Sequence, residues 1–228
     1  MRPVHPDLIE ALGLLRRLAE FCPVVIGTPP LGIATESSDI DVACSTQDLG
    51  HFADVARDHF GHMESFSLRT ARHLPDPAVI ASFLAMEWEI ELFCQRLATE
   101  DQWGVRHFRI EERLLRLGPQ LREPVVRLKQ DGLKTEPAFA RILALPGDPY
   151  EALLGLETLA DDDLRTMIEM AQVPGCTDPQ CDAGFFSGRP RVTECAKDPG
   201  RHPVRAYFAE GAAQRPPIGG RSTKTRAP

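Results

Sequence analysis

Several familiar sequence features are absent from this chain. No apolar run approaches the roughly 20 residues that a membrane-spanning helix needs. The first residues, MRPVHPDLIE, lack the basic and then apolar arrangement of a signal peptide. The phosphate-loop signature of many ATPases and the Gly-x-Ser-x-Gly elbow of many hydrolases are also missing. We therefore expect a cytoplasmic protein with no membrane partner that belongs to neither enzyme class.

Cysteines are few, and their spacing is poor for metal binding. They lie at positions 22, 44, 94, 176, 181 and 195. The first three fall in apolar segments and are expected to be small core residues. The last three are spaced C-x4-C-x13-C, whereas zinc sites usually contain closely paired cysteines. Free thiols are the better interpretation of these three.

Basic clusters are missing from most of the chain. The net charge is −7, and residues 174–228 carry 9 basic and 5 acidic residues, which leaves 17 basic and 28 acidic residues elsewhere. An acidic body argues against a broad DNA-binding surface. Residues 174–228 also contain 8 prolines and 7 glycines with little apolar periodicity, so we expect a disordered tail there.

Apolar periodicity predicts an α+β fold with helices packed on a sheet and a helical section after it. Helices are expected at 7–21 and at about 46–60, the second capped by Ser45 or Thr46, and five more after residue 100. The expected strands are 22–27, 39–44, 63–70, 78–84 and 86–94. The expected divisions are a core at 1–98, the helical section at 99–173 and the tail at 174–228.

The stretch 24-VVIGTPPLGIATESSDIDVAC-44 contains the most informative residues. In a strand, Asp39 and Asp41 point to the same face, because side chains two residues apart share a face. Paired carboxylates repel each other unless a cation lies between them, and Mg²⁺ prefers one or two carboxylates together with substrate phosphates. Gly27 lets the backbone approach a ligand closely, and the Thr28 hydroxyl can contact phosphate oxygens.

A third carboxylate is expected from the later strand 86-MEWEIELFCQ-95. Glu87, Glu89 and Glu91 alternate with apolar residues and are expected to share one face. Glu91 is the first choice as catalytic residue and metal ligand, with Glu89 in reserve. The competing interpretation is that the aspartate pair and the alternating glutamates only solubilise an exposed sheet face.

This grouping resembles the signature of the nucleotidyltransferase superfamily, which has a polymerase-β-like fold with a mixed sheet. Thr28 stands where serine is usual, and it keeps the hydroxyl. The prolines at 29 and 30 are a larger departure, because they remove backbone donors from the loop.

A closer resemblance covers most of residues 7–171. The segments GTPPLGIATESSDIDV, WEIELFCQ, 132-GLKTEPAF-139 and 147-GDPYEALL-154 are similar to those of a bacterial family known as domain of unknown function 4269. That family has been grouped with the nucleotidyltransferase fold, and it has no assigned reaction.

The resemblance implies a Mg²⁺-dependent transfer of a nucleoside monophosphate from a nucleoside triphosphate, with Mn²⁺ as a possible substitute. Asp39, Asp41 and Glu91 would be catalytic and metal-binding, and the acceptor would be an unknown small molecule, protein or RNA end. Lys129 and Lys134 are candidate triphosphate contacts, although lysines on helices usually face solvent.

Two alternatives stay open: a non-catalytic relative that binds a nucleotide or a partner protein, and a structural module. Arg106 and His107 are interpreted as an ion-paired and a buried structural residue, and Glu136 as a residue favoured by the start of a helix.

Overall fold

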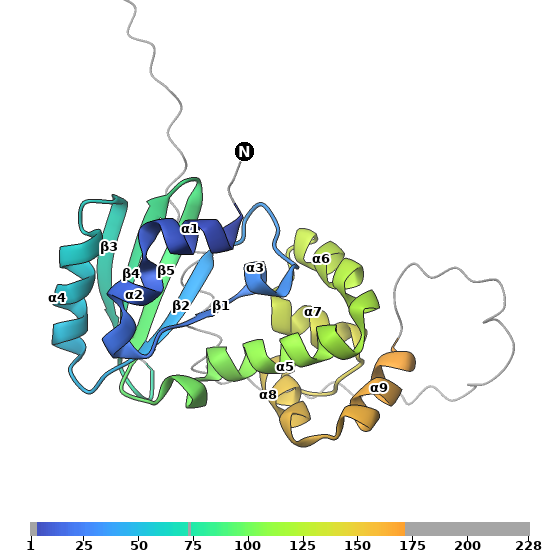
Figure 1. Cartoon of the computed structure of the whole chain (residues 1–228). Coiled ribbons are helices and arrows are strands. Elements are labelled where there is room, and N and C mark those ends of the chain that lie inside the picture. Colours follow the sequence, from blue (N-terminus) through green and yellow to red (C-terminus); the bar gives the residue numbers. More distant parts are fainter. Residues whose placement is uncertain (1–3, 73, 172–228) are drawn as a thin grey trace, which may run out of the picture.

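Five strands form one mixed sheet in the order β1-β2-β5-β4-β3 (Figure 1). β2 and β5 run parallel, and the other neighbouring pairs are antiparallel. The strands are β1 (Val24–Ile26), β2 (Ile40–Ser45), β3 (Glu64–Ala71), β4 (Ala78–Ala85) and β5 (Trp88–Gln95). The predicted α+β fold with a mixed sheet is therefore confirmed.

This computed structural model describes residues 4–72 and 74–171, so the predicted tail and its three cysteines lie outside the described residues. Four helices accompany the sheet: α1 (His5–Leu12), α2 (Leu14–Arg17), α3 (Thr28–Leu31) and α4 (Leu49–Phe60). Five follow it: α5 (Trp103–Leu117), α6 (Arg122–Gln130), α7 (Thr135–Ile142), α8 (Pro149–Leu154) and α9 (Asp161–Glu169). None of these helices has the length and apolar character needed to cross a bilayer.

Two predicted helix boundaries were wrong. The helix expected at 7–21 is interrupted at Gly13, whose left-handed φ of 59° ends α1 before α2 begins. The cap of α4 is Asp48, whose Oδ1 accepts a hydrogen bond from the backbone N–H of His51 at 2.9 Å. Ser45 instead ends β2. A more suitable carboxylate cap three residues later thus displaced the predicted hydroxyl caps.

Two expectations about single residues were also wrong. Glu87 lies in the turn between β4 and β5 with a φ of 67°, so it does not share a strand face with Glu89 and Glu91. The tight hairpin turn needs positive φ values, which shortens the strand at its start. Cys22 is exposed, whereas Cys44 and Cys94 are buried as expected.

The two faces of the sheet have different chemistry. Ile40 and Val42 of β2 and Leu92 of β5 belong to a buried cluster that also contains Phe52 and Phe60 of α4. Successive strand residues point to opposite faces, so Asp41, Glu91 and Phe93 point away from this core. One sheet face therefore stabilises the fold, and the other is available to line a cavity.

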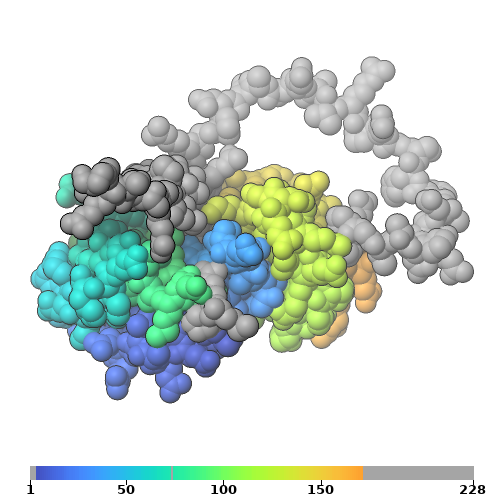
Figure 2. Space-filling model, turned by 90° about the horizontal axis from the view of Figure 1, so that it is seen from above, coloured from blue at the N-terminus to red at the C-terminus, as the bar shows by residue number. Residues whose placement is uncertain are grey.

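The helices after the sheet surround a second buried cluster, which includes Leu31 and Ile33 from the segment before β2. Arg122 donates a hydrogen bond to the carbonyl of Leu31, and Lys129 Nζ donates one to the carbonyl of Ile33 at 3.1 Å. In Figure 2 this segment (mid-blue) lies between the strands (cyan and green) and the helices (yellow-green). It ties the two clusters together, and the division at residue 98 stays a prediction.

Replacing Phe60 tests the packing of α4 on the sheet. Phe60 stacks on Phe83 with ring centroids 5.0 Å apart, and each side chain is only 1% exposed. We expect Phe60→Ala to lower the free energy of unfolding by about 3–5 kcal/mol, because the loss of buried apolar surface and the cavity left behind both destabilise the folded state. Urea denaturation followed by circular dichroism measures this. Leu15→Ala, at a 42% exposed position, is the control and should cost about 0.5 kcal/mol or less. Equal losses in both variants would contradict the packing.

Candidate functional site

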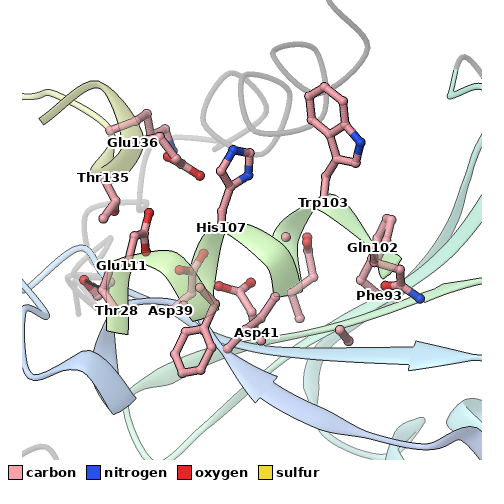
Figure 3. A pocket seen from close by; sticks show the side chains of 18 of the residues that line it. Thr28, Asp39, Asp41, Phe93, Gln102, Trp103, His107, Glu111, Thr135 and Glu136 are labelled. Carbon is pink, nitrogen blue, oxygen red and sulfur yellow. Dashed lines mark hydrogen bonds between the residues drawn. The ribbon is translucent and has the colours of Figure 1, made fainter. Parts of the chain in front are cut away.

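The parallel pairing of β2 with β5 sets Asp41 directly beside Glu91. Asp39 immediately precedes β2, and all three line one cavity of about 500 Å³. Figure 3 shows the carboxylates of Asp39 and Asp41 on the cavity side of β2, below α5. The structure therefore brings together the three acids that the sequence singled out.

Position 27 requires glycine for two reasons: its backbone conformation and the lack of room for a Cβ atom. Its φ is 83°, and a Cβ placed there would lie only 2.6 Å from Oδ2 of Asp41. The antiparallel pairing of Ile26 with Asp41 produces this approach. The Asp41 carboxylate consequently rests against the bare backbone of Gly27, which no larger residue allows.

The Thr28 hydroxyl is held within the loop that follows it. Thr28 Oγ1 donates to Ser38 Oγ at 2.9 Å, and the same Ser38 oxygen accepts the backbone N–H of Thr35 at 2.9 Å. Pro29 and Pro30 occupy the first turn of α3, where backbone N–H groups have no partner within the helix. The two prolines therefore cost α3 no hydrogen bond, although they leave fewer donors for a phosphate.

The crowding of carboxylates changes the pKa of Asp41. Burial raises this pKa well above its ordinary value, and the negative charges of Asp39 and Glu91 raise it further. Lys134 acts in the opposite direction, while Glu136 adds to the rise. A cation at this position would stabilise the ionised carboxylates that the protein alone disfavours.

The donor set is suited to Mg²⁺ at the two aspartates. Within residues 4–72 and 74–171, no three acidic, histidine or cysteine side chains are close enough to form a metal site by themselves. Two carboxylates with substrate phosphates and water are, however, the usual Mg²⁺ ligands. Glu91 already forms an ion pair with Arg69, whose Nη2 lies 3.2 Å from Oε2 of Glu91. The arrangement is therefore better suited to one metal ion held by Asp39 and Asp41 than to two metal ions held by Asp39, Asp41 and Glu91.

The remaining predicted residues surround the same cavity. Lys129 lies on α6, and burial lowers the pKa of its ammonium group to about 8, against the opposing charges of Glu111, Asp39 and Glu136. Lys134, just before α7, is exposed and also lines the cavity, as does the exposed Glu89. Both lysines can therefore reach a ligand between the sheet and the helices.

Five buried polar residues of the cavity are not among the sequence-based site candidates: Ser38, Gln102, His107, Glu111 and Glu136. His107 and Glu111 lie on α5, and Glu136 lies on α7. The sequence signal for His107 and Glu111 is their spacing, since residues four apart on a helix share a face. This face of α5 is buried and also carries Ile110 and Leu114. Arg106, by contrast, pairs with a carboxylate as expected, with Nε 3.1 Å from Oε1 of Glu157.

Replacing Gly27 isolates the role of its contact with Asp41. Gly147 has a similar φ of 85°, but no atom lies within 4 Å of a Cβ placed there. We expect Gly147→Ala to lower stability by about 1–3 kcal/mol from backbone strain alone. Gly27→Ala should lower it more, because the new methyl group displaces the Asp41 carboxylate. Only this variant should weaken the Mg²⁺-dependent nucleotide binding that the sequence resemblance predicts. Thermal unfolding and calorimetric titration measure both effects. Equal behaviour of the two variants would show that the contact is unimportant.

Comparison with known proteins gives one family and several remote structural neighbours. Crystal structures of the Cid1 poly(U) polymerase match at 13% identity: the one with bound MgGTP has a TM-score of 0.41 and covers 65% of this chain and 46% of that chain. Another has a TM-score of 0.45 and covers 62% and 47%. The GLD-2/RNP-8 complex matches at 11% identity with a TM-score of 0.43, covering 71% and 72%. The matched part is thus less than half of the Cid1 chains.

No curated protein matches significantly. The family described as "Domain of unknown function (DUF4269)" matches residues 7–156, which ends before the predicted limit of 171. This match spans all five strands and every residue that lines the cavity. The chain therefore belongs to the DUF4269 family.

Proposed function

We propose that this protein is a Mg²⁺-dependent nucleotidyltransferase that moves a nucleoside monophosphate from a nucleoside triphosphate to an acceptor hydroxyl. The observation that supports this most is the position of Asp41, which lies beside Glu91 in the strand register and against Gly27 at the cavity. Clustered carboxylates beside an open backbone turn suit a metal-bound triphosphate. The function is inferred from these side chains, because the structural neighbours are remote.

In the proposed reaction, Asp39 and Asp41 would hold Mg²⁺, or Mn²⁺ in its place, and the metal would supply positive charge to neutralise the triphosphate. The acceptor oxygen forms a bond to the α-phosphorus, and the bond from that phosphorus to the bridging oxygen breaks, so that pyrophosphate leaves. Glu91 accepts the acceptor's proton. For this step it must turn away from Arg69, which now lies 3.2 Å from it.

The other predicted residues position the phosphates. Gly27 and Thr28 supply the close backbone approach, and Lys129 and Lys134 supply positive charge from the helix side of the cavity. Phosphoryl transfer needs mainly positioning and charge stabilisation from the protein. These residues meet that requirement without a covalent intermediate on the chain.

A non-catalytic, nucleotide-binding role is the second candidate. The ion pair between Glu91 and Arg69 favours it, because an engaged carboxylate is a weaker base and metal ligand. This alternative differs from the first in one respect: nucleotide binds, but no pyrophosphate is released.

Three substitutions separate binding from chemistry. Asp39→Asn and Asp41→Asn should each weaken Mg²⁺-dependent binding of nucleoside triphosphates by about tenfold or more, since one charged ligand is lost. Glu91→Gln should keep that affinity but lower pyrophosphate release by about 10²–10⁴-fold, as expected for loss of a general base. Calorimetry and a pyrophosphate assay measure the two properties.

The matched control for these substitutions is Asp58→Asn, which changes an exposed carboxylate on α4 outside the cavity. It should change neither property. Undiminished binding in both Asp39→Asn and Asp41→Asn would rule out the proposed metal site, and binding without any pyrophosphate release in the unaltered protein would favour the non-catalytic role.

The affinity for triphosphate should also depend on pH through Lys129. Because the pKa of Lys129 is lowered to about 8, the free protein loses this charge as the pH rises through that value. Affinity should then fall by about tenfold between roughly pH 7 and pH 9.5, as a charge-assisted contact is lost. Lys129→Gln should bind more weakly at pH 7 and show a much flatter profile. A steep profile that survives in Lys129→Gln would assign the titration to another group.

A further inference from the structure

The helix side of the cavity carries three buried polar side chains that the proposed reaction does not use. His107 and Glu111 lie one turn apart on α5, and Glu136 lies in the first turn of α7; they are 2%, 5% and 8% exposed. Figure 3 shows them gathered together, with the Glu136 carboxylate directed toward His107. We call these three residues the α5–α7 wall.

Two atoms of this wall are hydrogen-bond acceptors without donors. Oε1 of Glu111 and Nδ1 of His107 are buried, and neither has a partner among the residues that the structure describes. His107 Nε2 lies 2.9 Å from the carbonyl oxygen of Tyr150. A carbonyl can only accept, so Nε2 donates to it, and in the tautomer with the proton on Nε2 the Nδ1 atom is an acceptor. Unpartnered buried polar atoms are rare and costly, which indicates that a ligand supplies the missing donors.

The orphan atom of Glu111 lies in a wall that also carries the carboxylate of Glu136. Burial raises the pKa of Glu111 well above its ordinary value, Glu136 raises it further and Lys129 opposes the rise. Lys129 also donates to the carbonyl of Ile33. At Glu136, where burial again raises the pKa, His107, Lys134 and Lys129 oppose the rise. Glu111 therefore has less opposing charge around it than Glu136, and a bound cation would relieve its repulsion from Glu136.

On the basis of the proposed nucleotidyltransferase function, we propose that the α5–α7 wall binds a protonated amine of the acceptor substrate. The acceptor is then a small molecule that carries both an ammonium group and a hydroxyl. An ammonium group offers three N–H donors and no acceptor, which complements the orphan atoms of Glu111 and His107 as well as the excess negative charge. An anion would be repelled, and a ligand group with only acceptor atoms would leave both orphans unpaired.

This binding mode also orients the substrate. The wall and the strand acids Asp39, Asp41 and Glu91 line the same cavity of about 500 Å³. An amine fixed at the wall leaves a hydroxyl on the same molecule free to extend toward Glu91 and the bound triphosphate. Holding the reacting groups in this way accelerates transfer by removing rotational and translational freedom.

The experiment compares two small probes of similar shape, 1,3-diamino-2-propanol and glycerol. Both have three polar groups on a three-carbon chain, but only the diamine is cationic. Ligand-observed NMR titration is carried out on the full chain at about 150 mM salt to screen non-specific attraction, with and without Mg²⁺ and a nucleoside triphosphate. We expect the diamine to bind and glycerol to bind at least tenfold more weakly.

Three variants locate the site of the diamine. Glu111→Gln keeps the shape of the side chain and should weaken diamine binding by about tenfold, the usual effect of losing one charged partner. Glu136→Gln provides a second test if the first variant is unstable. Glu112→Gln changes the adjacent, exposed residue of α5 and should have no effect.

The outcomes distinguish this inference from the proposed function. Triphosphate binding and pyrophosphate release without any preference for the diamine would overturn the amine site alone. Diamine binding that depends on Glu111 but persists in Asp41→Asn, with no triphosphate binding in the unaltered protein, would overturn the nucleotidyltransferase proposal alone. Equal losses in Glu111→Gln and Glu112→Gln would mean attraction to the general acidic surface. If Glu111→Gln changes the preference among nucleobases and leaves diamine binding unchanged, the α5–α7 wall contacts the base of the nucleotide, and the amine site is overturned.

Discussion

The repulsion between neighbouring carboxylates is the constraint around which this site is organised. Strand pairing holds Asp41 beside Glu91, and Asp39 lies immediately before β2. The sheet tolerates their repulsion because buried apolar side chains on its other face stabilise it. Gly27 removes the one side chain that would keep Asp41 at a distance. Burial and the neighbouring carboxylates raise the pKa of Asp41, so ionisation of this group is unfavourable in the protein alone, and the proposed divalent cation would stabilise the ionised form.

The same constraint extends across the cavity. Its lining contains two lysines against seven acids, which are Asp39, Asp41, Asp76, Glu89, Glu91, Glu111 and Glu136. A free triphosphate would be repelled by such a surface, whereas one that carries its metal is partly neutralised. The two groups of acids also lie on different parts of the fold, one on strands and one on helices. In the proposed reaction, the strand acids and the helix acids would therefore contact different chemical groups of the bound ligands.

The sequence predicts the strand acids well because a strand has a simple period. Once 39–44 and 86–94 are recognised as strands, the common face of Asp39 and Asp41 follows from alternation alone. Glu87 was assigned wrongly because the hairpin turn begins before β5. The break at Gly13 and the cap at Asp48 depend on local geometry that periodicity does not contain. Glu111 was missed for a different reason: an acid on a helix normally faces solvent, whereas Glu111 lies on the face of α5 that is buried with Ile110 and Leu114.

Parallel pairing between β2 and β5 has a consequence for how the molecule is assembled. Residue 41 meets residue 91 only after α4, β3 and β4 have been added between them. During synthesis, Asp39 and Asp41 therefore emerge before strand β5 exists, and the Gly27-Thr28 turn emerges before the helices on the other side of the cavity. Contacts so distant along the chain form late and slowly. The cavity therefore forms only in the complete fold, and a fragment that ends before β5 lacks part of its lining.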